Sequence, residues 1–199
     1  MPDVIGWIVS NWIEALGFAT GIASVWLFAR QHLAAWPVGI VTSLCWLVLF
    51  LQSGLYADSG LQVFYVAVSV YGWWHWIRGR PASQEELPVT RTPPRLTLAL
   101  IGVTISGTLM LGVFLDRATD STVPVPDAAT TVLSLAAYFL LARKHIENWP
   151  IWILGVNIPY LVLYVYKGLV LTAVLQPLFI ALSIRGWWNW QRDLRAGET

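Results

Sequence analysis

The sequence predicts an all-helical integral membrane protein with seven transmembrane helices. Hydrophobic residues make up 57% of the 199 residues and charged residues only 12%, which is about half the charged fraction of a typical soluble domain. A chain of this length cannot bury such an apolar surplus in one water-soluble core. Its 13 tryptophans also favour a bilayer, because tryptophan is enriched at membrane–water interfaces.

Seven apolar stretches approach the length of about 20 residues that a membrane-spanning helix needs. They cover residues 12–29, 36–53, 58–77, 95–115, 128–142, 149–166 and 171–190. Two hydrophilic segments, 79–94 and 116–127, contain proline and charged residues and are predicted to be loops outside the hydrocarbon. Residues 1–11 form a short N-terminal segment and residues 193–199 a C-terminal tail.

The basic residues predict the orientation of these spans. With the N-terminus outside and the C-terminus inside, nine basic residues lie on the cytoplasmic side and two on the outer side. The inner set is Arg30, Arg78, Arg80, Arg91, Arg95, Arg143, Lys144, Arg192 and Arg195, and the outer set is Arg117 and Lys167. Cytoplasmic loops are enriched in Lys and Arg, so we predict an N-out, C-in topology.

The chain also contains an internal repeat. The strings ARQHLAAWP and ARKHIENWP open matching segments: positions 29–53 match 142–166 at an offset of 113, and 54–78 match 168–192 at an offset of 114, with Lys167 as the inserted residue. Seventeen of these fifty positions are identical. Each repeat (12–78 and 128–192) holds three helices, so the linker helix 95–115 makes the two repeats parallel. This 3+1+3 arrangement is typical of SWEET-like transporters.

Polar side chains form stripes on three of the predicted helices. At about 100° per residue, they share one face of each helix. The stripes contain Asp58, Gln62, Tyr65, Ser69, Trp73 and Trp76; Trp149, Asn157, Tyr160, Tyr164 and Lys167, with Trp152 at the edge; and Thr172, Gln176, Phe179, Ser183, Trp187 and Trp190. Polar groups in hydrocarbon are costly and are often functional, so the stripes predict a cleft for a small polar solute.

Structural explanations compete with that prediction. Tryptophans beside Arg78 and Arg192 suit an interfacial belt, and Gln62 and Gln176 could bond between helices. Trp152, Asn157 and Tyr160 could serve packing. The residues that we favour for solute contact on their own chemistry are Asn157, Tyr160, Trp152, Gln62 and Gln176.

The sequence offers no catalytic constellation. It lacks a phosphate-binding GxxxxGK[ST] loop and the zinc motif HExxH, so we predict no enzymatic activity, cofactor or metal. The net charge of +1 provides no field for nucleic acid. Without a nucleotide-hydrolysing domain, this chain cannot couple transport to ATP by itself.

Two strings in the sequence resemble the nicotinamide riboside transporter (PnuC) family. They are GLYADSGLQVFYVAVSVYGWWHW and ENWPIWILGVNIPYLVLYVYKG, and the resemblance spans roughly residues 14–192. It implies a 3+1+3 membrane fold in the bacterial inner membrane, a homotrimer, and facilitated diffusion of a vitamin that a cytosolic kinase then traps. The family's binding residues would correspond to Trp149, Trp152, Asn157 and Gln62, with Tyr65 and Tyr71 in the tyrosine run.

Departures from the family pattern leave the solute open. The chain has Leu175-Gln176-Pro177 where relatives commonly show Leu-Tyr, and Arg185 replaces an apolar residue. Nicotinamide riboside is the first expectation, because Trp and Tyr faces attract a flat cationic ring; thiamine and riboflavin are alternatives within the family. A SWEET-like sugar transporter and a membrane receptor subunit are the rival readings.

Overall fold

The computed structural model describes residues 12–52, 56–79, 86–119, 123–166 and 170–197. The N-terminal segment 1–11, Arg80, Lys167 and the other residues between these ranges lie outside this description. The helices are α2 (Trp12–Ala29), α3 (Ala35–Gln52), α4 (Tyr56–Arg78), α5 (Pro94–Ala118), α6 (Pro124–Ala142), α7 (Asn148–Pro150), the π-helix η1 (Ile151–Asn157), α8 (Ile158–Tyr166) and α9 (Val170–Gly197). Each of the seven predicted spans coincides with a helix, since α7, η1 and α8 run continuously.

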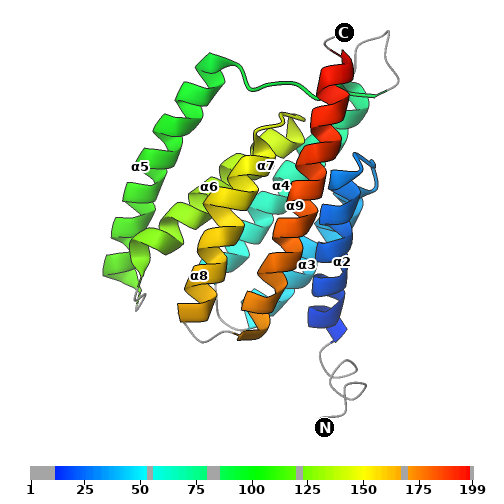
Figure 1. Cartoon of the computed structure of the whole chain (residues 1–199). Coiled ribbons are helices and arrows are strands. Elements are labelled where there is room, and N and C mark those ends of the chain that lie inside the picture. The colour runs from blue at the N-terminus through cyan, green and yellow to red at the C-terminus, as the bar shows by residue number, and fades with distance from the viewer. Residues whose placement is uncertain (1–11, 53–55, 80–85, 120–122, 167–169, 198–199) are drawn as a thin grey trace. The chain divides into compact units, whose positions relative to one another are not determined.

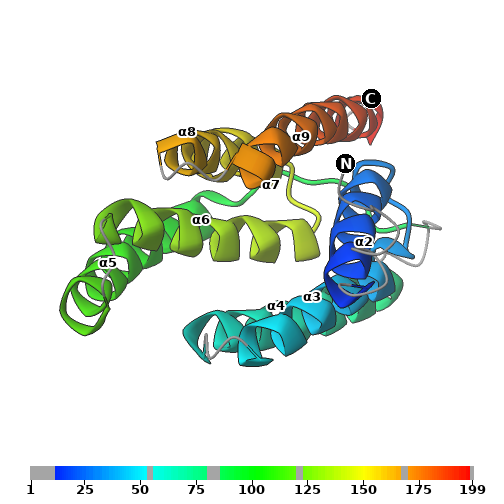
Figure 2. The ribbon, with the colours of Figure 1, turned by 90° about the horizontal axis from the view of Figure 1, so that it is seen from below.

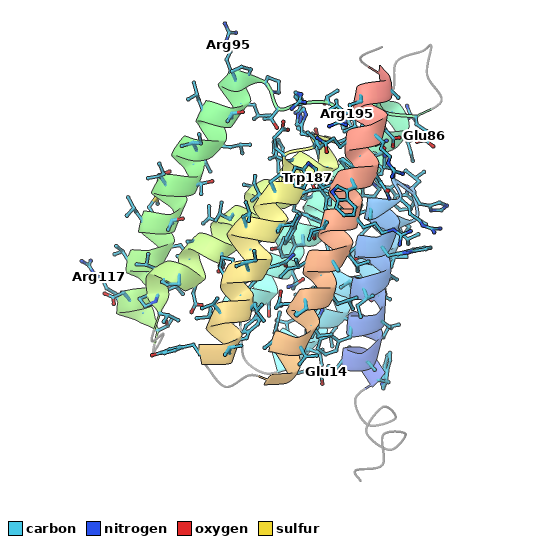
Figure 3. All side chains as sticks on the ribbon, viewed as in Figure 1. Glu14, Glu86, Arg95, Arg117, Trp187 and Arg195 are labelled. Atoms are coloured by element: carbon cyan, nitrogen blue, oxygen red, sulfur yellow. The ribbon has the colours of Figure 1, made fainter. Side chains whose placement is uncertain are left out.

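Helix lengths and composition agree with a multi-pass membrane protein. Within the described residues, five helices are long and apolar enough to cross a membrane: α2, α3, α5, α6 and the run Asn148–Tyr166. Figure 3 shows Arg95 and Arg117 at the two ends of α5, with no charged residue between 96 and 115. Helix α9 has 28 residues, about 42 Å, so it continues beyond a hydrocarbon layer of about 30 Å and includes most of the expected tail.

The contacts divide the chain into two compact units, residues 1–86 and 87–199. In the first unit, α3 packs against both α2 and α4 (Figure 1). In the second, the continuous helix α7–η1–α8 packs against α6 and α9, and α5 packs against α6, as Figure 2 shows from below. Each unit therefore contains a set of three helices in which the second in sequence contacts the other two, and the second unit also contains α5.

Both units use the same turn to leave their first helix. Gln31 and Lys144 adopt left-handed backbone conformations, with φ of 56° and 59°. The amide of His32 bonds the Leu27 carbonyl at 3.0 Å, and the amide of His145 bonds the Leu140 carbonyl at 2.9 Å. These are six-to-one bonds of the Schellman motif. The AR-x-H strings thus encode helix ends, although the left-handed position usually belongs to glycine.

In the second unit, residues 87–93, which we call the strap, attach to this turn. Thr90 donates its amide to the Lys144 carbonyl at 3.1 Å and accepts at its own carbonyl from the Ile146 amide at 3.0 Å. Glu147 accepts from the Thr92 amide at 2.9 Å and from the Thr92 hydroxyl at 2.6 Å. The buried Lys144 ammonium donates to the Leu87 carbonyl. Residues 87–93 of the predicted loop 79–94 are therefore attached to the turn after α6.

The prediction of a uniform α-helix over 149–166 is wrong at its centre. Residues Ile151–Asn157 form a π-helix, and the amide of Ile158 bonds the Ile153 carbonyl five residues back. Pro159 follows directly; proline has no amide hydrogen, and its ring would clash with the carbonyl four residues earlier, that of Gly155. A wider turn relieves that clash. The single face predicted for Trp149, Asn157 and Tyr160 assumed an α-helical period, which this segment does not have.

Candidate functional site

Each unit is built around a tryptophan that lies directly against a glycine. In the first unit, Trp36 is fully buried, and a Cβ atom built on Gly72 would lie 2.3 Å from its ring. Trp76 meets Trp36 edge to face with ring centroids 5.3 Å apart, and Phe28 does so at 4.7 Å. The ring of Trp36 thus fixes the distance between α3 and α4.

The second unit contains the matching arrangement around Trp149. Its side chain is 2% exposed, a Cβ on Gly186 would lie 2.5 Å from its ring, and Trp190 meets it edge to face at 5.5 Å. The Trp149 indole nitrogen is buried and has no hydrogen-bond partner among the described residues. Trp149 was predicted to contact solute; the structure shows that its ring packs between helices of its own unit, and its contact with solute stays a prediction.

The π-helix carries two more of the predicted site residues. Trp152 is half-buried within η1, and Asn157, the last residue of η1, is 7% exposed. Residues five apart lie about 140° apart around an α-helix, but nearly one above the other in a π-helix, whose turns close between residues i and i+5. The π-helix therefore brings Trp152 and Asn157 toward one face, whereas the α-helical period placed Trp152 only at the edge of the stripe that contains Asn157.

Tyr160 lies one turn further along, in α8. Its ring stacks parallel to that of Tyr164, with centroids 5.2 Å apart and an interplanar angle of 1°. Both tyrosines are half-buried. The two rings form an aromatic surface that follows Asn157 along the same helix.

Gln176 lies on α9, which packs against η1 and α8. Its side chain is 7% exposed, and its amide oxygen is buried with no hydrogen-bond partner among the described residues. A buried polar atom left without a partner costs about 1–3 kcal/mol, so such an atom needs an explanation such as a ligand or water. Trp149, Trp152, Asn157, Tyr160 and Gln176 thus all lie in the second unit, on two helices that pack against each other.

The remaining predicted residues lie on α4 in the first unit. Gln62, Tyr65 and Tyr71 are all half-buried. The Tyr65 carbonyl accepts the hydroxyl of Ser69 at 2.7 Å, and the Tyr71 ring stacks on His75 with centroids 5.6 Å apart. The α4 stripe faces the interior at Ser69 and Trp76, whereas Asp58 and Trp73 are exposed.

Two further residues were missed by the sequence analysis. Asn148 is fully buried; its side-chain nitrogen donates to the His145 carbonyl at 2.7 Å, while its side-chain oxygen has no partner within the described part of the chain. Pro159 was read as an ordinary member of a span. Its place directly after Asn157 was the available signal, because proline inside a helix removes a backbone bond.

Comparison with known proteins identifies the family. A family model described as "Nicotinamide mononucleotide transporter" matches residues 11–192. This chain belongs to that family. The match begins before α2 and ends within α9, so the family covers both units. The resemblance to PnuC-type transporters is thereby confirmed.

Individual relatives of the family agree with this assignment. The chain is 24% identical to the nicotinamide riboside transporter PnuC of Escherichia coli (strain K12), over 93% of this chain and 87% of that protein. It is 29% identical to the riboflavin/roseoflavin transporter RibM of Streptomyces davaonensis, over 92% of this chain and 88% of that protein. The fold resembles the crystal structure of the vitamin B3 transporter PnuC with a TM-score of 0.75 and 21% identity, covering 97% of this chain and 86% of that one.

Proposed function

We propose that this protein carries nicotinamide riboside, or a closely related B vitamin, across the bacterial inner membrane by facilitated diffusion. Membership of the family and the apolar helices support a multi-pass transporter. Relatives named as nicotinamide riboside transporters support the solute. The solute enters down its gradient, and a cytosolic kinase traps it by phosphorylation without direct contact with the transporter.

One observation carries the proposal. In the second unit, the buried amide oxygen of Gln176 has no hydrogen-bond partner among the described residues. A buried polar atom without a partner is costly and needs an explanation such as a ligand or water. An acceptor of this kind suits a solute that carries hydroxyl or amide donors. The half-buried Trp152 and Tyr160 offer faces for a flat cationic ring.

The finer architecture is part of the proposal. The same Trp–Gly–Trp packing and the same Schellman turn occur in both units, which supports two parallel three-helix repeats joined by α5. The positive-inside bias supports an N-out, C-in topology. We further propose a homotrimer, as the family resemblance implies. On the same resemblance, Gln62, Tyr65 and Tyr71 of α4 stay proposed solute contacts.

Riboflavin is the second candidate solute. The relative named as a riboflavin/roseoflavin transporter is 29% identical, whereas the nicotinamide riboside transporters among the relatives are 22–24% identical. Riboflavin also has a flat ring and a polyhydroxyl chain, so the same aromatic and amide groups could hold it. Uptake must therefore be measured for both solutes.

Uptake into liposomes tests the proposed function. Purified protein is reconstituted and offered labelled nicotinamide riboside, riboflavin, thiamine and a hexose in parallel. We expect saturable uptake of nicotinamide riboside that needs no ion gradient and stops when the inside and outside concentrations are equal. Uptake of riboflavin alone would make riboflavin the assigned solute. Uptake of the hexose alone would refute both nicotinamide riboside and riboflavin as the solute.

The binding residues are tested by removing single amides. Asn157→Leu should weaken binding about tenfold to a hundredfold, because the lost bonds leave polar groups of the solute unpaired at a cost of about 1–3 kcal/mol. Gln176→Leu and Gln62→Leu should act in the same direction. Calorimetric titration gives the affinities, and size-exclusion elution shows whether the fold is intact. Parental affinity in all three variants would place the site elsewhere.

A further inference from the structure

The π-helix lies where the offset that aligns the two repeats changes from 113 to 114 residues. The strings Leu-Val-Leu at 47–49 and 161–163 are identical at an offset of 114, and Trp46 then pairs with the aromatic Tyr160. Upstream, Trp36, Pro37 and Ile40 pair with identical residues at an offset of 113. The one-residue insertion therefore falls between Ile153 and Tyr160, and not at Lys167. Most of that interval is η1 and the residues that end it.

The offset at which exposed side chains of the two repeats match also changes at this place. Val41 is 40% exposed and Leu154 is 67% exposed, at an offset of 113. Beyond η1 the exposed positions pair at an offset of 114: Leu44 with Ile158, Val48 with Val162 and Leu51 with Val165. A π-turn holds about one residue more than an α-turn, so η1 accommodates the extra residue and keeps both flanking segments on their proper faces.

The matching segment of the first unit lacks this feature. Helix α3 is a regular α-helix throughout Ala35–Gln52, with Cys45 where the register-corrected match to Pro159 falls. In the second unit, the amide of Ile158 bonds the Ile153 carbonyl, and Pro159 has no amide to offer either Leu154 or Gly155. The backbone of the second unit thus lacks one helical bond at the carbonyls of Leu154 and Gly155, which no proline removes from the equivalent part of α3.

We propose that the inserted residue and Pro159 make η1 the bending point of the solute-bearing helix, so that the second unit supplies the motion by which the solute is released. Sharp bends in helices concentrate at prolines and π-bulges, and transporter sites commonly lie at interruptions of membrane helices. Gly155 lies at this point and faces α6: a Cβ atom added to Gly155 would lie 3.2 Å from the side chain of Leu133. The first unit, with α3 regular, acts as the stiffer half.

The inference rests on the proposed function but has a test independent of the solute. Hydrogen–deuterium exchange is measured on the full-length protein in detergent for peptides covering 151–160 and 38–47. We expect amides in 154–160 to exchange at least tenfold faster than those in the matched first-unit peptide. Equal protection of the two segments would overturn the bending point, whatever the protein transports.

Deletion of Gly155 is the sharper variant, and deletion of Thr42, its match at an offset of 113, is the control. Removal of Gly155 takes out the inserted residue, so α7–η1–α8 can become a regular α-helix with both flanks in register. Removal of Thr42 from a helix that is already regular turns the rest of α3 by about 100°. We expect the Gly155 deletion to yield parental amounts of protein with parental elution, and the Thr42 deletion to abolish both. Loss of folded protein in the Gly155 deletion would refute the insertion.

Transport and binding should then separate. In the Gly155 deletion, Trp152 and Asn157 become four residues apart in an α-helix and stay on one face, so nicotinamide riboside should bind within about threefold of the parental affinity. Uptake into liposomes should fall at least tenfold. Pro159→Ala, which restores an amide without changing the length, should slow uptake in the same direction with unchanged binding. Parental uptake by the well-folded deletion variant would overturn the proposal. If the parent protein neither binds nor carries nicotinamide riboside, the proposed function is refuted. In that case the hydrogen–deuterium exchange result alone decides whether η1 is the bending point.

Discussion

Two glycines decide how closely helices approach in this protein. Gly72 and Gly186 each lie against the ring of a buried tryptophan, and an added Cβ would be 2.3 Å from Trp36 in one case and 2.5 Å from Trp149 in the other. Membrane helices gain stability mainly by close packing, for which small residues are suited. The buried rings cannot move aside without displacing Trp76 or Trp190, which they touch edge to face.

We therefore expect Gly72→Ala and Gly186→Ala to destabilise the protein. Overpacking a filled interior costs about 1–3 kcal/mol, which exceeds the gain of about 1 kcal/mol from replacing glycine by alanine in a helix. Gly102→Ala is the matched control, because no atom lies within 4 Å of its added Cβ. Thermal unfolding in detergent should show a lower midpoint for the first two variants and an equal or higher one for the control. Equal midpoints in all three would refute this account.

At the scale of elements, the strap joins the loop before α5 to the turn after α6. Its attachment uses a carboxylate, Glu147, and a buried ammonium, Lys144. The corresponding positions of the first repeat hold Ala34 and Gln31, so the residues that bind the strap are particular to the second repeat. Hydrogen bonds to charged groups contribute about 1.5–3 kcal/mol each, which is enough to keep a short segment attached.

Removal of the Glu147 carboxylate should release the strap. We expect Glu147→Ala to raise the rate of trypsin cleavage after Arg91 by about tenfold or more, because cleavage follows the population of the detached state and about 1.4 kcal/mol corresponds to a factor of ten. Glu14→Ala, which makes the same charge change in α2, is the control and should leave cleavage unchanged. Cleavage of Glu147→Ala at the parental rate would mean that other contacts hold the strap.

At the scale of the whole molecule, the proposed topology places the strap in the cytoplasm and the end of α5 outside. Single cysteines in a Cys45→Ser background test this at two exposed positions, Glu86 and Ala118. In intact cells, an impermeant maleimide should label Ala118→Cys, whereas Glu86→Cys should react only after the membrane is opened. The reverse pattern would invert the positive-inside assignment.

The sequence predicted more of the elements than of the site. All seven spans coincide with helices, because a membrane helix is specified by apolar length and composition, which are properties of consecutive residues. The fifth span begins earlier than expected, at Pro124, because proline is favoured in the first turn of a helix. For the site, the side chains of Asn157 and Gln176 are buried and the ring of Trp149 lies within the helix packing of its unit, and the contact of all three with solute stays a prediction.

By itself, the sequence determined the membrane class, the spans and the family, because hydropathy, repeated strings and motifs can be read along the chain without knowledge of contacts. The tertiary structure decided how the backbone accommodates the inserted residue, which glycine each tryptophan meets, and how the strap is attached. These features depend on backbone bonds that shift by one residue at η1 and on contacts between residues that are more than thirty positions apart. A helical period in the sequence cannot predict these features, because it assumes the same rotation about the helix axis for every residue.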